Sequence, residues 1–186
     1  MQRQSGLTLV ELMVVLAIIV ILVAIGMPAY TNITNSYRMS SEINSLLGDL
    51  QYARGEALRE GQYVTVCVAN AAATQCSGLA SWQNGWIVFS NPVPTNSVPA
   101  AGTILHVQGA FTGAHPDTFT ASNNISAISY SREGFANTAA GFASTLITLH
   151  NQPTPSTGYT RCLWITSQGT ASIQTNTNNF SGFACN

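Results

Sequence analysis

Cysteine is the residue type in this sequence whose number and spacing point most directly to a specific chemistry, namely disulfide formation or metal binding. The four cysteines are Cys67, Cys76, Cys162 and Cys185. Four cysteines allow three pairings, and we favour Cys67 with Cys76 and Cys162 with Cys185, which closes one short and one moderate loop. A zinc site is the alternative, but there is no Cys-x-x-Cys pair and no histidine near a cysteine in the sequence. The cysteines therefore predict disulfides, an oxidising compartment and no metal.

Residues suited to catalysis are scarce. The histidines and aspartates are His106, His115, His150, Asp49 and Asp117. The segment His115-Pro-Asp117 has no nucleophile motif or metal-ligand cluster around it, so we interpret it as a surface loop. A glycine-rich phosphate-binding loop is also missing from the sequence. We therefore expect no enzyme activity, no cofactor and no small-molecule substrate.

One carboxylate, Glu11, lies inside an apolar run. Residues 7–30 carry no other charge and are long enough to cross a bilayer as a helix. Arg3, in the short polar segment before them, favours a cytoplasmic N-terminus and places the rest of the chain outside. A carboxylate inside a span is costly and signals a functional partner, although Glu11 is near enough to the start to snorkel to the interface. Taken alone, the position of Glu11 favours a functional role for this carboxylate only slightly over simple snorkelling.

Two other interpretations of this apolar run are a cleaved secretory signal peptide and a plain membrane anchor. The run is longer than the usual apolar region of a signal peptide, and a suitable cleavage site with small residues is lacking. Neither interpretation explains Glu11.

The predicted secondary structure begins with one long helix. Pro28 is predicted to kink the helix rather than end it, and Gly61 is its natural stop. Beyond the span, apolar residues recur at intervals of three and four, which predicts an amphipathic helix with Glu42, Asp49 and Glu56 off the apolar face. The apolar stripe consists of Met39, Ile43, Leu46, Leu47, Leu50, Ala53 and Ala57.

After Gly61 the pattern changes to strands. Seven segments rich in β-branched and aromatic residues alternate with loops rich in Ser, Thr, Asn and Pro. These segments are residues 63–68, 85–90, 103–107, 125–130, 146–149, 159–166 and 171–174. One helix followed only by strands predicts an α+β fold.

The composition narrows the class of protein. Charged residues make up 7% of the 186 residues, lysine is absent, and the net charge is −1, whereas soluble domains have about 25% charged residues. Such a sequence suits a protein outside the cytoplasm or packed among copies of itself. The apolar fraction of 46% argues against disorder, and the lack of a basic cluster argues against nucleic-acid binding.

The N-terminal residues resemble a known processing signal. Gly6, followed by Leu7-Thr-Leu-Val-Glu11 and an uninterrupted apolar run, strongly resembles the class III signal of type IV pilins and type II secretion pseudopilins. This resemblance implies that a prepilin peptidase cuts after Gly6 and methylates Leu7, which makes Glu11 the fifth residue of the mature chain. The family usually has Phe at the position of Leu7.

The resemblance also gives Glu11 a partner. Its carboxylate could pair with the new amine of Leu7 in its own chain or in a neighbouring subunit. Between subunits the pair would set the axial stagger, because an unpaired carboxylate in apolar surroundings is expensive.

The rest of the chain resembles the GspH/FimT branch of pilin-like proteins, which includes minor pilins such as FimU. The resemblance rests on the Cys67–Cys76 loop leading into residues 82–89, on residues 128–134, and on the final Cys162–Cys185 segment. It implies the type IV pilin fold, a long kinked helix packed on an antiparallel β-sheet domain. The implied parts are a leader (1–6), a transmembrane polymerisation helix (7–30), the amphipathic half of the helix (31–61) and a β-rich periplasmic domain (62–186).

The implied function is that of a minor pilin, held in the bacterial inner membrane and then incorporated with other pilin subunits into a type IV pilus, whose assembly it helps to initiate. A minor pseudopilin of a type II secretion system is the alternative. A membrane-tethered periplasmic domain and a DNA-uptake pilin are less favoured. Some FimT-like pilins bind DNA through Gly-Arg-x-Arg, but this chain has Gly169-Thr-Ala-Ser172 at the matching place. We therefore expect no nucleic-acid partner.

Overall fold

The protein divides into two compact units, Met1–Tyr37 and Arg38–Asn186. The structure, a computed structural model, describes residues 8–91, 103–112, 117–138, 141, 144–152, 158–175, 179–180 and 183–185. One helix, α1 (Leu9–Glu60), contributes its first part to the first unit and its remainder to the second.

Within the second unit, α1 contributes one face to the core. The predicted apolar stripe is confirmed: every member is at most 1% exposed except Leu47, which is partly buried. Glu42 departs from the expectation, because it is only 8% exposed. It lies three residues after Met39 and four before Leu46, so it shares their face of the helix. The helix ends where expected: Gly61 has a φ of 66°, and its N–H donates to the carbonyl of Ala57 at 3.0 Å.

Two antiparallel sheets complete the second unit. The five-stranded sheet has the order β3-β2-β1-β5-β6 and the four-stranded sheet the order β4-β7-β8-β9, while β10 and β11 pair as a hairpin. The first sheet consists of β1 (Tyr63–Val68), β2 (Trp86–Asn91), β3 (Ile104–Gln108), β5 (Ala127–Tyr130) and β6 (Ala136–Thr138). The second sheet and the hairpin consist of β4 (Thr118–Ala121), β7 (Thr145–His150), β8 (Arg161–Ile165), β9 (Ala171–Thr175), β10 (Asn179–Phe180) and β11 (Phe183–Ala184).

Each of the seven predicted segments forms a strand, which confirms the α+β class. Four strands were missed: β4, β6, β10 and β11. They have at most four residues, which leaves little periodic pattern, and they are formed by hydrogen bonding to neighbouring strands; β5 is equally short but was predicted because it ends the longer segment 125–130. For example, β4 is formed by pairing of Thr118 with His150 and of Ala121 with Ile147 in β7.

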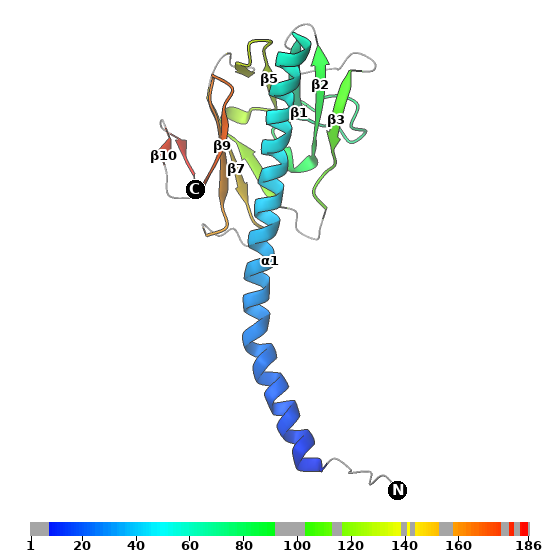
Figure 1. Ribbon diagram of the computed structural model, residues 1–186, viewed down its shortest axis with the longest axis vertical. Coiled ribbons are helices and arrows are strands. Elements are labelled where there is room, and N and C mark those ends of the chain that lie inside the picture. The colour runs from blue at the N-terminus through cyan, green and yellow to red at the C-terminus, as the bar shows by residue number, and fades with distance from the viewer. Residues whose placement is uncertain are drawn as a thin grey trace. The chain divides into compact units, whose positions relative to one another are not determined.

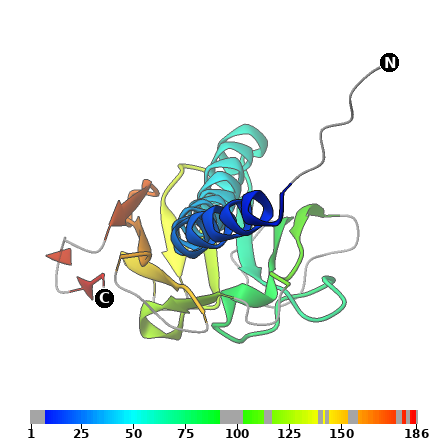
Figure 2. The same ribbon diagram turned by 90° about the horizontal axis from the view of Figure 1, so that it is seen from below.

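The core lies between α1 and the strands. Figures 1 and 2 both place the cyan part of α1 against one face of the strands. Two short 3-10 helices, η1 (Trp82–Asn84) and η2 (Ser122–Asn124), join strands. An aromatic cluster fills the interior, with ring centroids of neighbouring members 5.3 to 6.5 Å apart. Its members are Trp82, Trp86, Phe111 and Phe119.

Candidate assembly site

Glu11 lies in the first turn of α1 and takes part in capping that turn. Thr8 precedes the helix, and its Oγ1 accepts a hydrogen bond from the backbone N–H of Glu11 at 3.2 Å. The Thr8 carbonyl accepts the N–H of Leu12, also at 3.2 Å. Threonine followed three residues later by glutamate is the capping-box spacing, and a carboxylate in the first turn also favours the helix dipole. This local role of Thr8 was not predicted from the sequence, although the spacing of Thr8 and Glu11 indicates it.

Glu11 is surrounded along α1 by exposed apolar side chains. All side chains of residues 8–27 are exposed, including Leu16 at 54% and Ile19 at 48%. Among the described residues, α1 is the one helix that could cross a membrane by length and composition; its most apolar stretch has a mean hydropathy of 3.1 and none of it is buried. An uncovered apolar surface of this size marks contact with a membrane or another protein.

The other predicted residues of this segment cannot be placed in the same way. Gly6 and Leu7 lie outside the described residues, and so does the side chain of Pro28, whose backbone belongs to α1. Cleavage after Gly6 and the kink at Pro28 stay predictions.

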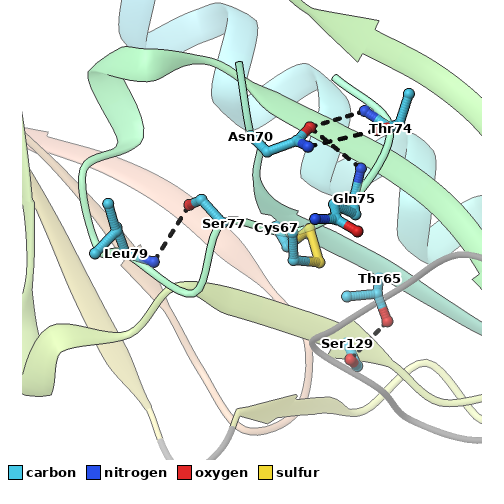
Figure 3. Close-up of a disulfide and its surroundings, with 9 residues drawn as sticks. Thr65, Cys67, Asn70, Thr74, Gln75, Ser77, Leu79 and Ser129 are labelled. Carbon is cyan, nitrogen blue, oxygen red and sulfur yellow. Dashed lines mark hydrogen bonds between the residues drawn. A yellow bond between two sulfur atoms is a disulfide. The ribbon is translucent and has the colours of Figure 1, made fainter. Parts of the chain in front are cut away.

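The four cysteines form two disulfides, and each is the local pair. Cys67 in β1 bonds to Cys76, with a Cα–Cα distance of 5.6 Å. The loop between them is also held by Asn70, whose Oδ1 accepts the N–H groups of Thr74 at 2.9 Å and Gln75 at 3.4 Å (Figure 3). This disulfide fastens the loop that leads from β1 towards β2.

The second disulfide joins Cys162 in β8 to Cys185, with a Cα–Cα distance of 5.9 Å. Cys185 directly follows β11, so the bond attaches the end of the chain to the four-stranded sheet. All four sulfur atoms are therefore occupied. Among the described residues, no group of three or more His, Cys, Asp or Glu side chains is arranged to hold a metal ion.

Asp117 corrects the interpretation of His115-Pro-Asp117 as a surface loop. His115 lies outside the described residues, but Asp117 is only 2% exposed. Its Oδ2 accepts Nε of Arg38 at 2.7 Å and its Oδ1 accepts Nη2 of the same residue at 2.9 Å. The backbone N–H of Gln152 donates to Oδ1 at 2.9 Å. This aspartate is thus an ion-pair partner of α1, a role that sequence spacing cannot show because the partners are 79 positions apart.

Glu42 lies beside this ion pair. Burial, followed by the negative charge of Asp117, raises the pKa of Glu42 to about 7, and Arg38 opposes that shift. Oε2 of Glu42 is buried and has no hydrogen-bond partner among the described residues. The cluster thus holds two carboxyl groups against one guanidinium.

Arg54 connects α1 to two turns of the sheets. Its Nε donates to the carbonyl of Gly134 at 3.1 Å, and its Nη2 donates to the carbonyl of Gln168 at 3.2 Å. Gly169, with a φ of 80°, lies so close to Gly134 that an added Cβ would be 2.0 Å from the Gly134 carbonyl oxygen. The residues after Gly169, where a Gly-Arg-x-Arg motif would have its arginines, lead into β9 beside this contact.

His106 belongs to a separate contact. Its Nδ1 lies 3.1 Å from Oδ1 of Asp49, and Oδ2 of Asp49 accepts Nε1–H of the buried Trp86 at 2.7 Å. Asp49 therefore ties α1 to strands β2 and β3. This arrangement is structural, because the carboxylate supplies a hydrogen-bond acceptor for the N–H of a buried indole.

Comparison with known protein families gives two matches. The family described as type II transport protein GspH matches residues 42–169. The prokaryotic N-terminal methylation motif matches residues 1–27. The second match contains Gly6, Leu7 and Glu11.

Two curated relatives are fimbrial proteins of Eikenella corrodens. EcpC is 34% identical over 116 residues, which are 58% of this chain and 71% of EcpC. EcpB is 34% identical over 106 residues, which are 52% of this chain and 64% of EcpB.

The fold is similar to that of the type IV minor pilin FimU of Pseudomonas aeruginosa. One crystal form gives a TM-score of 0.59 at 17% identity and covers 81% of this chain and 96% of FimU. A second crystal form gives 0.56 at 16% identity and covers 79% and 99%. At these identities the likeness establishes the fold.

Proposed function

Because the chain belongs to the type II transport protein GspH family and carries the prokaryotic N-terminal methylation motif, we propose that it is a minor pilin of a type IV pilus. Members of this pilin-like family are structural subunits rather than enzymes. The observation that carries the proposal is the fully exposed apolar stretch of α1 with the single carboxylate of Glu11 in its first turn. The two fimbrial relatives support the choice of a pilus.

The proposed path to the filament begins in the inner membrane. Residues 7–30 would span it once, with residues 1–6 in the cytoplasm and the β-rich domain, residues 62–186, in the periplasm. The two disulfides are consistent with that oxidising compartment. Prepilin peptidase would then remove residues 1–6 and methylate Leu7. The amphipathic half, residues 31–61, would connect the span to the sheet domain.

Glu11 is proposed to select the register of assembly. Cleavage after Gly6 creates an ammonium group at Leu7, and the mature chain has no lysine that could compete for the carboxylate. In a dry helix bundle an unpaired carboxylate is costly, so a subunit would be held most stably where its Glu11 meets the amine of a neighbouring Leu7. Because the chain has no lysine, this N-terminal amine, which becomes a secondary amine on methylation, is the only aliphatic amine of the proposed mature chain and therefore a selective target for acylating labels.

Three variants separate charge pairing from helix capping at Glu11. Glu11→Gln keeps the capping-box capacity, which glutamine shares with glutamate, but removes the charge. Thr8→Ala keeps the charge and removes the cap seen in the structure, at a cost of about 1 kcal/mol to the first turn. We expect Glu11→Gln and Glu11→Ala to be processed and retained in the membrane but to be absent from filaments, whereas Thr8→Ala is incorporated.

The measurement is immunoblotting of purified filaments, with membrane fractions as the loading control. Intact-mass analysis after amine labelling shows whether each variant begins at Leu7. Incorporation of Glu11→Gln at the wild-type level would contradict the charge-pairing proposal. Failure of Thr8→Ala alone would assign the site to capping.

A minor pseudopilin of a type II secretion system is the second candidate, favoured by the description of the matching family. Deletion of the gene distinguishes the two functions. If the protein is a minor pilin, the deletion strain should have fewer surface pili and normal protein secretion. If it is a pseudopilin, the deletion strain should retain exoproteins in the periplasm and have normal piliation.

A further inference from the structure

We propose that Arg38, Glu42 and Asp117 form a proton-dependent latch that fastens the beginning of the domain's helical segment to the residue just before β4. The latch is closed when the Glu42 carboxyl carries a proton and is weakened when that proton leaves. All three residues belong to the unit Arg38–Asn186, and Arg38 is the first residue of that unit. This inference is independent of which filament the protein joins.

The fixed part of the latch is the ion pair between Arg38 and Asp117. Both oxygens of Asp117 accept hydrogen bonds from the guanidinium, at 2.7 and 2.9 Å, and the side chain of Asp117 is fully buried. Gln152 adds a backbone donor to the same carboxylate. These three donors satisfy the hydrogen-bonding capacity of both Asp117 oxygens inside the domain. The single positive charge of Arg38 is therefore already committed to Asp117.

The variable part is Glu42, one helical turn after Arg38 on α1. When protonated, its carboxyl group can donate to Asp117, and the cluster has balanced charge. When ionised, the cluster has two buried negative charges and one positive charge. Oε2 of Glu42 is buried without a partner among the described residues, so the ionised form lacks compensation there.

Among the described residues, Asp117 and Arg38 are the two charged groups that act on the carboxyl of Glu42. On the neighbouring strand β7, His150 pairs with Thr118, the residue after Asp117. Burial lowers the pKa of His150, which favours its neutral form and makes it a poor countercharge for an ionised Glu42.

The sign of the pH dependence follows from the proton affinity of Glu42. Its pKa in the folded protein is about 7, above the ordinary value of 4.5. The folded state therefore binds the proton more tightly than the unfolded state does. The stabilisation from this proton is complete below about pH 4.5 and is lost as the pH rises through about 7.

The test uses the full chain in detergent micelles and compares wild type with Glu42→Gln and Glu133→Gln. Glutamine imitates the protonated glutamate, so Glu42→Gln keeps the latch closed at every pH. Glu133 is an exposed glutamate paired with its neighbour Arg132 and serves as the matched control. We expect the Tm of wild type and of Glu133→Gln to fall by several degrees between pH 5.5 and pH 8, and that of Glu42→Gln to fall much less.

Two further readouts locate the effect. At pH 8, the backbone amides of residues 38–45 should exchange hydrogen at least threefold faster in wild type than in Glu42→Gln, and at equal rates at pH 5.5. Carboxyl ¹³C NMR should show one of the five glutamates titrating near pH 7, and this signal should be missing in Glu42→Gln. Parallel Tm profiles for wild type and Glu42→Gln, or titration of Glu42 near pH 4.5, would overturn the proposal.

Discussion

At the level of single residues, position 169 requires glycine more strictly than the glycine positions in α1 do. Its φ of 80° lies in the left-handed region, and a Cβ there would be 2.0 Å from the carbonyl oxygen of Gly134. We expect Gly169→Ala to destabilise the protein by about 2 kcal/mol or more, from backbone strain and displacement of the Gly134 turn. Urea unfolding followed by tryptophan fluorescence measures the loss.

Gly48 supplies the matched control for that substitution. It is an exposed residue inside α1, and an added Cβ would have no atom within 4 Å. We expect Gly48→Ala to stabilise the protein by about 0.5 to 1 kcal/mol, because alanine loses less backbone entropy in a helix. Equal destabilisation by both substitutions would show that the contact with Gly134 is not the cause.

Residues are also where sequence reasoning reached its limit. The spacing of Gly6, Leu7 and Glu11 was readable because the motif is local and contiguous. Asp117 was not readable, because its partner Arg38 is 79 positions away and is brought to it only by the fold. Glu42 was misplaced for a related reason: helical periodicity places it on the apolar face, but its acidic type suggested the opposite. Thr8 was overlooked although its signal was local.

At the scale of elements, predictability followed length and periodicity. The helix could be predicted over its whole amphipathic half, because seven apolar residues repeat with helical spacing and Gly61 marks the end. The strands with five or six residues were also evident, and so was β5, whose four residues end the longer predicted segment 125–130. The short strands β4 and β6 were not, because they owe their conformation to hydrogen bonds with β7 and β5 rather than to their own composition.

The two disulfides are expected to stabilise their elements through the loops they close. Cys162–Cys185 spans 23 positions and Cys67–Cys76 spans 9. Chain-entropy estimates give about 3.4 and 2.6 kcal/mol respectively. We therefore expect a Cys162→Ser, Cys185→Ser double variant to lose at least as much stability as the Cys67→Ser, Cys76→Ser variant.

Urea unfolding of the two double variants under oxidising conditions makes this comparison. Each variant retains one disulfide, and a reductant breaks it. Adding a reductant should therefore lower the stability of both variants to a common level. A larger loss from the Cys67, Cys76 pair would mean that the packing of that disulfide against Ile87 and Phe89 outweighs the loop entropy.

At the scale of the whole molecule, the two units have opposite relations to their surroundings. The buried hydrophobic core begins at Met39 and continues to Cys185, so it belongs entirely to Arg38–Asn186. The described side chains of residues 8–27 are all exposed. The second unit therefore forms its core from its own side chains. The exposed apolar side chains of the first unit instead limit the solubility of the chain in water.

We expect a chain lacking residues 1–30 to be soluble without detergent and monomeric, because the apolar stretch of α1 is removed and every core residue is retained. Its Tm at pH 6 should lie within about 3 °C of that of the full chain in micelles, since a difference of 1 kcal/mol shifts Tm by about 2–4 °C in a protein of this size. Differential scanning calorimetry and size-exclusion chromatography provide the two measurements.

A shorter chain lacking residues 1–42 is the control: it also loses Arg38, Met39 and Glu42, so it should unfold at a markedly lower temperature. If the chain lacking residues 1–30 were as unstable as this control, the separation of the two units at Tyr37 would be wrong.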